Sequence, residues 1–357
     1  MEILLWIGFS QSLFSTILFL FVKKDNSLSN KILTAWLFII AFEFLTTGID
    51  ISMGKNHLTN PFLIFNPLIY FYSKSLINPG LKLRWWQLWH IIPYLFVKIG
   101  AYVSDIQFAP EEFFTIDAST WFKITMSLIS VGSFIVYSIP SIINVHRHRI
   151  NLKNEFSTID SKITLGWLLF VIIFYMSFMT IAYLLGIINI IAHIATYSQL
   201  VTFSFLLALV YIFSFYGLLQ EQIYPKDETD KSDKYKNPRL SEQESQKIRD
   251  KLENYFSKKK PYLDSELTIN NVSEHLKLPR HSLTEVLNIE IGKNFYQFVN
   301  DYRVREVKAK LSDLEYSHFS IDAIGYECGF NSKSSFYAVF KKTTAMTPTQ
   351  YRTSLKK

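Results

Sequence analysis

The order of apolar and polar residues divides the chain into two parts. Residues 1–220 consist mostly of long apolar runs, whereas residues 241–357 alternate apolar and charged positions. Runs of about 20 apolar residues have the length that an α-helix needs to cross a membrane. Apolar residues at positions i, i+3 and i+4 indicate helices that bury one face. Both patterns predict helices, so we expect an all-α fold with a membrane part followed by a globular part.

Seven apolar stretches predict membrane spans. They occupy residues 3–22, 32–52, 58–77, 86–104, 121–143, 163–188 and 193–220. The first stretch has no basic residue before it and is followed by Lys23 and Lys24 rather than by a cleavage site, so we interpret it as a retained span. We therefore expect a seven-helix transmembrane bundle over residues 1–222, with Pro67, Pro93 and Pro140 kinking their helices.

The loops between these stretches differ in charge, and the difference predicts an orientation. Basic residues gather after the first, third and fifth stretches, at Lys23, Lys24, Lys31, Lys74, Lys82, Arg84, Arg147, Arg149 and Lys153. The other loops hold few basic residues, and the loop after the fourth stretch is acidic. Loops rich in Lys and Arg stay on the cytoplasmic side. The N-terminus is therefore expected outside and the C-terminal part in the cytoplasm.

Residues 320–352 have the pattern of short helices joined by a tight turn. Ile324 and Phe330 belong to one apolar face, and Gly329 supplies a residue that tolerates positive φ where that face is interrupted. Asn331 is predicted to cap the second helix, and Pro348 to begin a third. Two short helices joined by a glycine-containing turn are typical of a helix-turn-helix unit.

The same pattern occurs a second time, earlier in the chain. A shift of 52 or 53 residues superposes the two copies, so that Phe336 falls on Leu283. A fixed repeat of this kind indicates a repeated structural unit. We therefore predict two helix-turn-helix units, at about 267–291 and 320–343, joined by a connecting helix at about 294–311.

The motif in the second unit resembles a known family. The segment IGYECGFNSKSSFYAVFKK followed by MTPTQYR is similar to the signature of AraC/XylS-type transcription regulators, and the resemblance covers about 261–352. It implies that residues 241–357 form a domain that binds double-stranded DNA by sequence, without catalysis and without a cofactor. Ala345 and Lys277 depart from the family pattern, since glycine is common at both positions.

Polar side chains on the second helix of each unit are the candidate DNA-binding residues. They are Arg280, His281, Thr284, Glu285 and Asn288 in the first unit, and Lys333, Ser334, Tyr337 and Lys341 in the second. Base edges in the major groove present donors, acceptors and methyl groups. Glu285 can accept a hydrogen bond from a cytosine amine, and Lys333 can reach either guanine or a phosphate.

Three ionisable residues lie inside predicted spans. They are Glu43, Asp50 and Lys98. Charged groups are costly in a membrane, and their presence there suggests a function. We regard these three as candidate sensor residues. A structural ion pair between Glu43 and Lys98 and a contact with a ligand are both open.

Composition limits the other chemistry. The single cysteine, Cys328, excludes an intramolecular disulfide and a cysteine metal cluster, and we expect no metal site. The formal net charge is +7, and most charged residues lie after residue 225. Residues 223–240 are polar and predict a solvated linker.

Taken together, these patterns predict a regulator embedded in a bacterial inner membrane. The expected partners are double-stranded DNA, the lipid bilayer, a signal that is a small molecule or a protein, and a second copy of the chain. Two alternatives stay open. One is a membrane transporter or enzyme with a regulatory DNA-binding tail. The other is a membrane anchor whose DNA-binding part is released by proteolysis in the linker.

Overall fold

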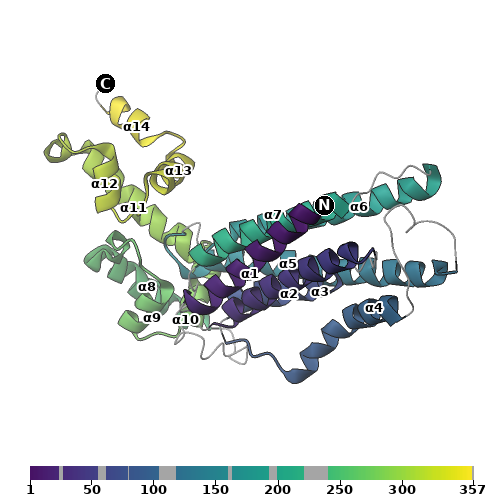
Figure 1. The fold of residues 1–357 in the computed structure, drawn as a ribbon. Coiled ribbons are helices and arrows are strands. Elements are labelled where there is room, and N and C mark those ends of the chain that lie inside the picture. The colour runs from purple at the N-terminus through teal and green to yellow at the C-terminus, as the bar shows by residue number, and fades with distance from the viewer. Residues whose placement is uncertain are drawn as a thin grey trace. The chain divides into compact units, whose positions relative to one another are not determined.

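The computed structural model describes residues 1–23, 27–54, 62–78, 80–103, 118–159, 163–192, 199–220 and 240–355 (Figure 1). These residues form helices and no strand, with one isolated antiparallel bridge between Phe156 and Thr268, which confirms the all-α prediction. Most of the predicted linker lies outside the described residues. The chain divides into two compact units. Unit 1 holds residues 1–146 and 165–232, and unit 2 holds residues 147–164 and 233–357.

Unit 1 consists of long apolar helices. They are α1 (Glu2–Phe21), α2 (Leu28–Ser52), α3 (Phe62–Ile77), the 3-10 helix η1 (Trp85–Ile91), α4 (Ile92–Val103), most of α5 (Thr120–Glu155), α6 (Gly166–Ala192) and α7 (Gln199–Leu219). Among the described residues, α1, α2, α5, α6 and α7 are long and apolar enough to cross a membrane, and α3 is a shorter apolar helix. Five of the seven predicted stretches therefore have the expected form.

The fourth predicted stretch, residues 86–104, is not one long helix. A 3-10 helix occupies Trp85–Ile91, and the α-helix that follows has 12 residues. Pro93 is the second residue of α4, where the missing N–H of proline would have no partner in any case. Proline therefore begins a helix here, and the predicted kink within a continuous span is wrong.

The helices of unit 1 bury small and polar residues beside an apolar core, and they also expose many large apolar residues. On α1 the buried face includes Gly8, Ser12 and Ser15, whereas Phe14 and Leu20 are more than half exposed. A side chain at Gly8 would overlap the ring of Phe44 on α2. The outer face of a helix that faces water is instead mainly polar. Small residues at helix contacts are typical of helices that pack in lipid.

Side-chain hydrogen bonds tie together the ends of three helices in unit 1. Lys23, just after α1, donates to the carbonyl oxygens of Gly217 and Gln220 at the end of α7. Trp167, near the start of α6, donates from Nε1 to Gln220 Oε1 at 2.8 Å. The end of α1, the start of α6 and the end of α7 therefore lie at the same end of unit 1.

Unit 2 contains the globular helices. They are α8 (Glu242–Lys259), η3 (Pro261–Leu263), α9 (Ile269–Leu276), α10 (Arg280–Glu285), the π-helix η4 (Val286–Glu290), α11 (Phe295–Ser312), η5 (Leu314–Tyr316), α12 (Ile321–Glu327), α13 (Lys333–Thr344) and α14 (Pro348–Ser354). Side-chain caps fix where several helices begin. Thr268, Ser320, Ser332 and Thr347 each accept a hydrogen bond from the third residue of the helix that follows.

The predicted pair of helix-turn-helix units is present in unit 2. Helices α9 and α10 form the first, α12 and α13 form the second, and α11 is the connecting helix. One apolar cluster surrounds Leu283 and Val286, and another surrounds Phe336 and Phe340. The first half of α11 belongs to the first cluster and its second half to the other. One rigid helix therefore joins the cores of both units.

The two residues that depart from the family pattern, Lys277 and Ala345, both have a left-handed backbone conformation. Lys277 ends α9 with φ of 53°, and Ala345 ends α13 with φ of 61°. In the repeat register these positions match Gly329 and Gly292, which also have positive φ. Each unit therefore has one glycine and one side-chain residue at its two left-handed positions. The predicted cap at Asn331 is wrong by one residue, because Ser332 Oγ accepts the hydrogen bond from Ser335.

Candidate nucleic-acid interface

The first candidate recognition helix exposes its start. Leu283 and Val286 are fully buried in the first core, and Arg280 and His281 lie exposed on the other side of α10. Thr284 is half-buried, and its hydroxyl donates to Arg280 O at 3.0 Å, which leaves its oxygen lone pairs able to accept. The predicted polar face is therefore present over the first turn.

The rest of this face differs from the predicted α-helix of residues 280–290. Val286–Glu290 form a π-helix, in which Ile291 N donates to Val286 O. The exposed Asn288 therefore lies in the π-helix and not in the α-helix that carries His281 and Thr284. Glu285 is half-buried, and its Oε1 accepts a hydrogen bond from Leu240 N at 3.3 Å. This carboxylate therefore fixes the entry to α8.

The second candidate recognition helix is one regular α-helix. Lys333, Ser334 and Lys341 are exposed along α13, and Tyr337 is half-buried against the second core. Lys333 Nζ lies 2.8 Å from Asp322 Oδ2 on α12 and 5.5 Å from the ring centre of Tyr337. The hydrogen bond to Asp322 raises the pKa of Lys333. The predicted residues are therefore together on one exposed stretch of helix.

The leading cation of each recognition helix pairs with a carboxylate. Arg280 and Lys333 occupy the same position in the repeat. Lys333 pairs with Asp322 of its own unit, whereas Arg280 pairs with Glu155, which precedes both units by more than 100 residues. Exposed pairs of this kind are weak, so a phosphate group can replace either carboxylate.

A buried arginine that the sequence analysis did not single out lies on α11, the helix that connects the two helix-turn-helix units. Arg303 on α11 is 1% exposed, and its guanidinium lies 5.8 Å from the ring centre of Phe330. Its Nε donates to Tyr262 O at 2.8 Å and its Nη2 to Asp264 O at 2.7 Å. Arg303 follows the buried Val299 by one helical turn, so an arginine in an apolar stripe was the available signal.

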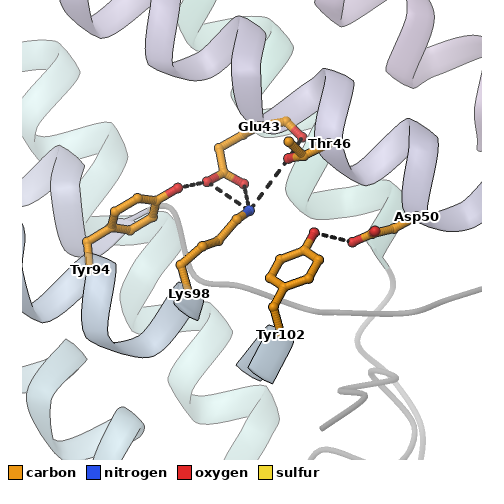
Figure 2. A network of polar contacts seen from close by, with 6 residues as sticks. All are labelled: Glu43, Thr46, Asp50, Tyr94, Lys98 and Tyr102. Atoms are coloured by element: carbon orange, nitrogen blue, oxygen red, sulfur yellow. Dashed lines mark hydrogen bonds and ion pairs between the residues drawn. The ribbon is translucent and has the colours of Figure 1, made fainter. Parts of the chain in front are cut away.

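The candidate sensor residues of unit 1 form a polar cluster between α2 and α4 (Figure 2). Glu43 is 1% exposed and accepts hydrogen bonds from Tyr94 and from Lys98 Nζ, the latter at 3.2 Å. Further along the same two helices, two turns after Glu43 on α2 and one turn after Lys98 on α4, Tyr102 donates to Asp50 at 2.5 Å. The ion pair between Glu43 and Lys98 is therefore formed, and both buried carboxylates are hydrogen-bonded.

Over the residues that the structure describes, no group of three or more His, Cys, Asp and Glu side chains is placed to bind a metal ion. The chemistry that the described site offers is recognition by hydrogen bonds and charge.

The C-terminal region resembles known regulators. Residues 272–354 match a family described as "Helix-turn-helix domain". The melibiose operon regulatory protein of Escherichia coli (strain K12) is 37% identical over 89 residues, which is 25% of this chain and 28% of that protein. The xylose operon regulatory protein of Haemophilus influenzae is 30% identical over 86 residues, which is 24% of this chain and 21% of that protein. An uncharacterized HTH-type transcriptional regulator of Staphylococcus aureus is 31% identical over 91 residues, 26% of this chain and 12% of that protein.

These similarities concern only the last quarter of the chain. The chain spans less than a third of the length of the melibiose regulators that it matches. A solved structure of a Listeria innocua protein aligns with 30% of this chain and 95% of its own, at 23% identity and a TM-score of 0.27. The family match and the two operon regulators, over about the same residues, show a helix-turn-helix domain in the C-terminal region.

Proposed function

We propose that this chain is a membrane-embedded transcription regulator that binds double-stranded DNA by sequence and responds to a signal received in or across the membrane. The observation that carries the DNA-binding part is the pair of helix-turn-helix units on one connecting helix, in the region that resembles operon regulators. Two units held by a single helix suit two successive major-groove contacts about one helical turn apart.

The exposed residues of the two recognition helices suit different tasks. Thr284 and Ser334 offer hydroxyl groups, which pair with base edges and so favour particular sequences. Lys341 lies further along α13 and carries a full charge, which suits a phosphate. We propose that Thr284 and Ser334 read bases and that Lys341 sets affinity.

The apolar outer surface of unit 1 supports membrane embedding. In α5, Ser130, Ser138 and Ser141 are buried, whereas Leu128 and Val136 are more than 60% exposed. Large contiguous apolar surfaces are rare on proteins that face only water. Lipid chains cover such surfaces without cost, and polar side chains then pair with one another inside the bundle.

The ends of the helices support the proposed orientation. The loop-charge rule assigns the end of α1, the start of α6 and the end of α7 to the cytoplasmic side. The hydrogen bonds of Lys23 and Trp167 with the end of α7 hold these same three ends together. We propose that the N-terminus is outside the inner membrane and that unit 2 is in the cytoplasm.

The polar cluster of Glu43, Lys98 and Asp50 is the proposed sensor. A buried ion pair contributes little net stability compared with apolar residues of the same size, so its presence in the bundle favours a role beyond packing. A small molecule or a protein partner that competes for Lys98 or Glu43 would change the packing of α2 against α4.

Selection of DNA from a random library by the full chain in lipid nanodiscs tests the proposed function. We expect an enriched motif with two elements centred about 10 base pairs apart. Lys341→Ala should weaken binding to selected and unselected DNA alike, and Lys251→Ala, an exposed lysine on α8, is the charge-matched control. A library that stays random after repeated rounds would contradict sequence-specific binding.

A further inference from the structure

Unit 2 contains a loop that lies far from the helix-turn-helix units in the sequence. This loop segment, residues 147–164, begins with the last turns of α5 after the fifth predicted span, and it belongs with residues 233–357 to one compact unit. Phe156 pairs with Thr268 in an antiparallel bridge, and Ser157 N donates to Leu267 O at 3.1 Å. The loop therefore adds a short extended segment beside the start of α9.

The side chains of α11 complete the contact with this loop. Arg303 donates from Nη1 to Ser157 O at 3.1 Å and to Thr158 Oγ1 at 3.0 Å, and from Nη2 to Ser157 Oγ at 3.0 Å. Asn300 Nδ2 also donates to Ser157 O, at 3.2 Å. Ser157, Asn300 and Arg303 are all less than 5% exposed. A guanidinium has five N–H donors, and Arg303 uses more than half of them on the loop.

The contact has the properties of a recognition site for this segment. The donors bind a backbone oxygen and a small hydroxyl side chain, and Ser157 is 1% exposed. If the loop left, a buried arginine would lose several partners, and such groups are costly to leave unpaired. The docked loop is therefore part of the folded unit and not an incidental neighbour.

Glu155 of the loop also neutralises the charge of Arg280, the leading cation of the first recognition helix. Glu155 pairs with Arg280, whereas the equivalent Lys333 of the second unit pairs with Asp322. In the repeat register Asp322 corresponds to Asn270, which has no charge. The second helix-turn-helix unit thus supplies the carboxylate for its own leading cation, whereas among the described residues the ion pair of Arg280 in the first unit is with Glu155 of the loop. Arg280 can therefore be released when the loop moves.

We propose that the surface formed by Leu267, Asn300 and Arg303 is a docking site for the chain's own segment 155–158, and that docking lowers DNA affinity by keeping Arg280 paired with Glu155. This inference deepens the proposed function and rests on it. The helix α5 ends at Glu155 and includes the fifth predicted span, so one helix leads directly into the docked segment. Docking and DNA binding oppose each other, and each must weaken the other to the same degree.

A cysteine pair tests docking and its effect on DNA in the same protein. The hydrogen bond of Ser157 N lies one residue beyond Phe156, so Phe156 and Thr268 form a non-hydrogen-bonded pair, whose Cα atoms are about 4.5 Å apart. This distance suits a disulfide. The native Cys328 is buried, and burial raises the pKa of its thiol to about 12, so it does not compete.

The experiment uses the full chain with Phe156→Cys and Thr268→Cys in lipid nanodiscs, oxidised by oxidised glutathione and then reduced. We expect a disulfide that neither single variant forms. The probe is a 30-base-pair duplex of mixed sequence. The oxidised form should make one phosphate contact fewer, so it should bind the duplex about fivefold more weakly at 0.15 M salt, with a slope of log K against log salt that is smaller by about one unit. Reduction should restore the affinity. Thr268→Cys also removes the cap of α9, but the oxidised and reduced forms both lack this cap, so its loss does not affect their comparison.

A second pair of variants keeps the charges comparable. Glu155→Gln should raise the affinity for the same duplex about fivefold at 0.15 M salt, whereas Glu253→Gln, from the exposed pair with Arg249 on α8, should leave it unchanged. Failure of the disulfide to form would overturn the docking site, and equal DNA affinity of the oxidised and reduced forms would overturn its inhibitory effect. If no form binds DNA at any salt concentration, the proposed function fails, and the disulfide yield still decides the docking site.

Discussion

Replacing Asp322 by asparagine should strengthen DNA binding, because it frees the leading cation of the second recognition helix. Asp322 Oδ2 lies 2.8 Å from Lys333 Nζ, and the Lys333 side chain is 62% exposed. Asparagine has nearly the same shape but no charge. The substitution removes a negative charge that would face the DNA backbone and leaves Lys333 able to pair with a phosphate.

The magnitude follows from counterion release. One additional phosphate contact adds about 0.9 to the slope of log K against log salt. Relative to 1 M salt, this slope corresponds to a gain of about fivefold at 0.15 M and about fifteenfold at 0.05 M. The loss of an acidic residue from the first turn of α12 costs about 0.3–1 kcal/mol of stability at most, so the domain should stay folded.

Binding titrations of the full chain in nanodiscs, with selected and scrambled duplexes over a salt series, measure this effect. Both duplexes should gain alike, since phosphate contacts carry no sequence information. Asp250→Asn on α8 is the matched control, because Asp250 is also exposed and hydrogen-bonded. An unchanged affinity, or a gain that is the same at every salt concentration, would refute the reasoning.

Three further predictions follow from the same geometry. Ala345→Gly should stabilise the second helix-turn-helix unit by about 0.5–1 kcal/mol. Glycine removes the strain of the left-handed backbone, but it also raises the entropy of the unfolded chain, which cancels part of this gain in stability. Hydrogen exchange of the α13 amides measures it, and Ala338→Gly in the same helix should have the opposite sign. Thr284→Ala should cost about 1–3 kcal/mol on the selected duplex and much less on scrambled DNA in competition titrations, and equal losses would exclude base reading. Glu43→Gln should lower protein level in cells, because a broken buried pair costs about 3–5 kcal/mol. Adding Lys98→Met should restore the level but not a reporter response to the signal, and recovery of both would indicate a purely structural pair.

The helix-turn-helix units were predictable because their determinants are local. Capping side chains, a turn glycine and apolar residues at helical spacing act within about 25 residues, and the repeat provided a second reading of the same pattern. The cap at Ser332 was missed by one residue because asparagine and serine are both good caps, and only the geometry of the following turn distinguishes them. The π-helix at Val286–Glu290 was missed because it keeps the same buried residues as an α-helix.

In the membrane part, hydropathy predicted the position of the long helices but not the form of every one. Apolar runs located the long helices α1, α2, α5, α6 and α7, since a span needs little beyond length and apolarity. Hydropathy does not distinguish a 3-10 helix followed by a short α-helix from one continuous span, so Trp85–Val103 was assigned incorrectly as a single helix.

Contacts between residues that are distant in the chain could not be predicted from the sequence. The ion pair of Glu43 with Lys98 was one of two alternatives, and nothing in the sequence chose between them. The basic residues near the end of α5 were interpreted only as a sign of the cytoplasmic side. Their neighbours Glu155 and Ser157 contact residues more than 100 positions away, and such pairing depends on the folded unit and not on local pattern.

The most direct test of the central claim is DNA crosslinking to the full chain in growing cells, with a C-terminal tag and with membranes separated by flotation before the DNA is sequenced. Our account predicts that specific genomic sites are recovered with the full-length protein from the membrane fraction. Specific DNA recovered only with a shorter fragment in the soluble fraction, or no enriched site in either fraction, would contradict it.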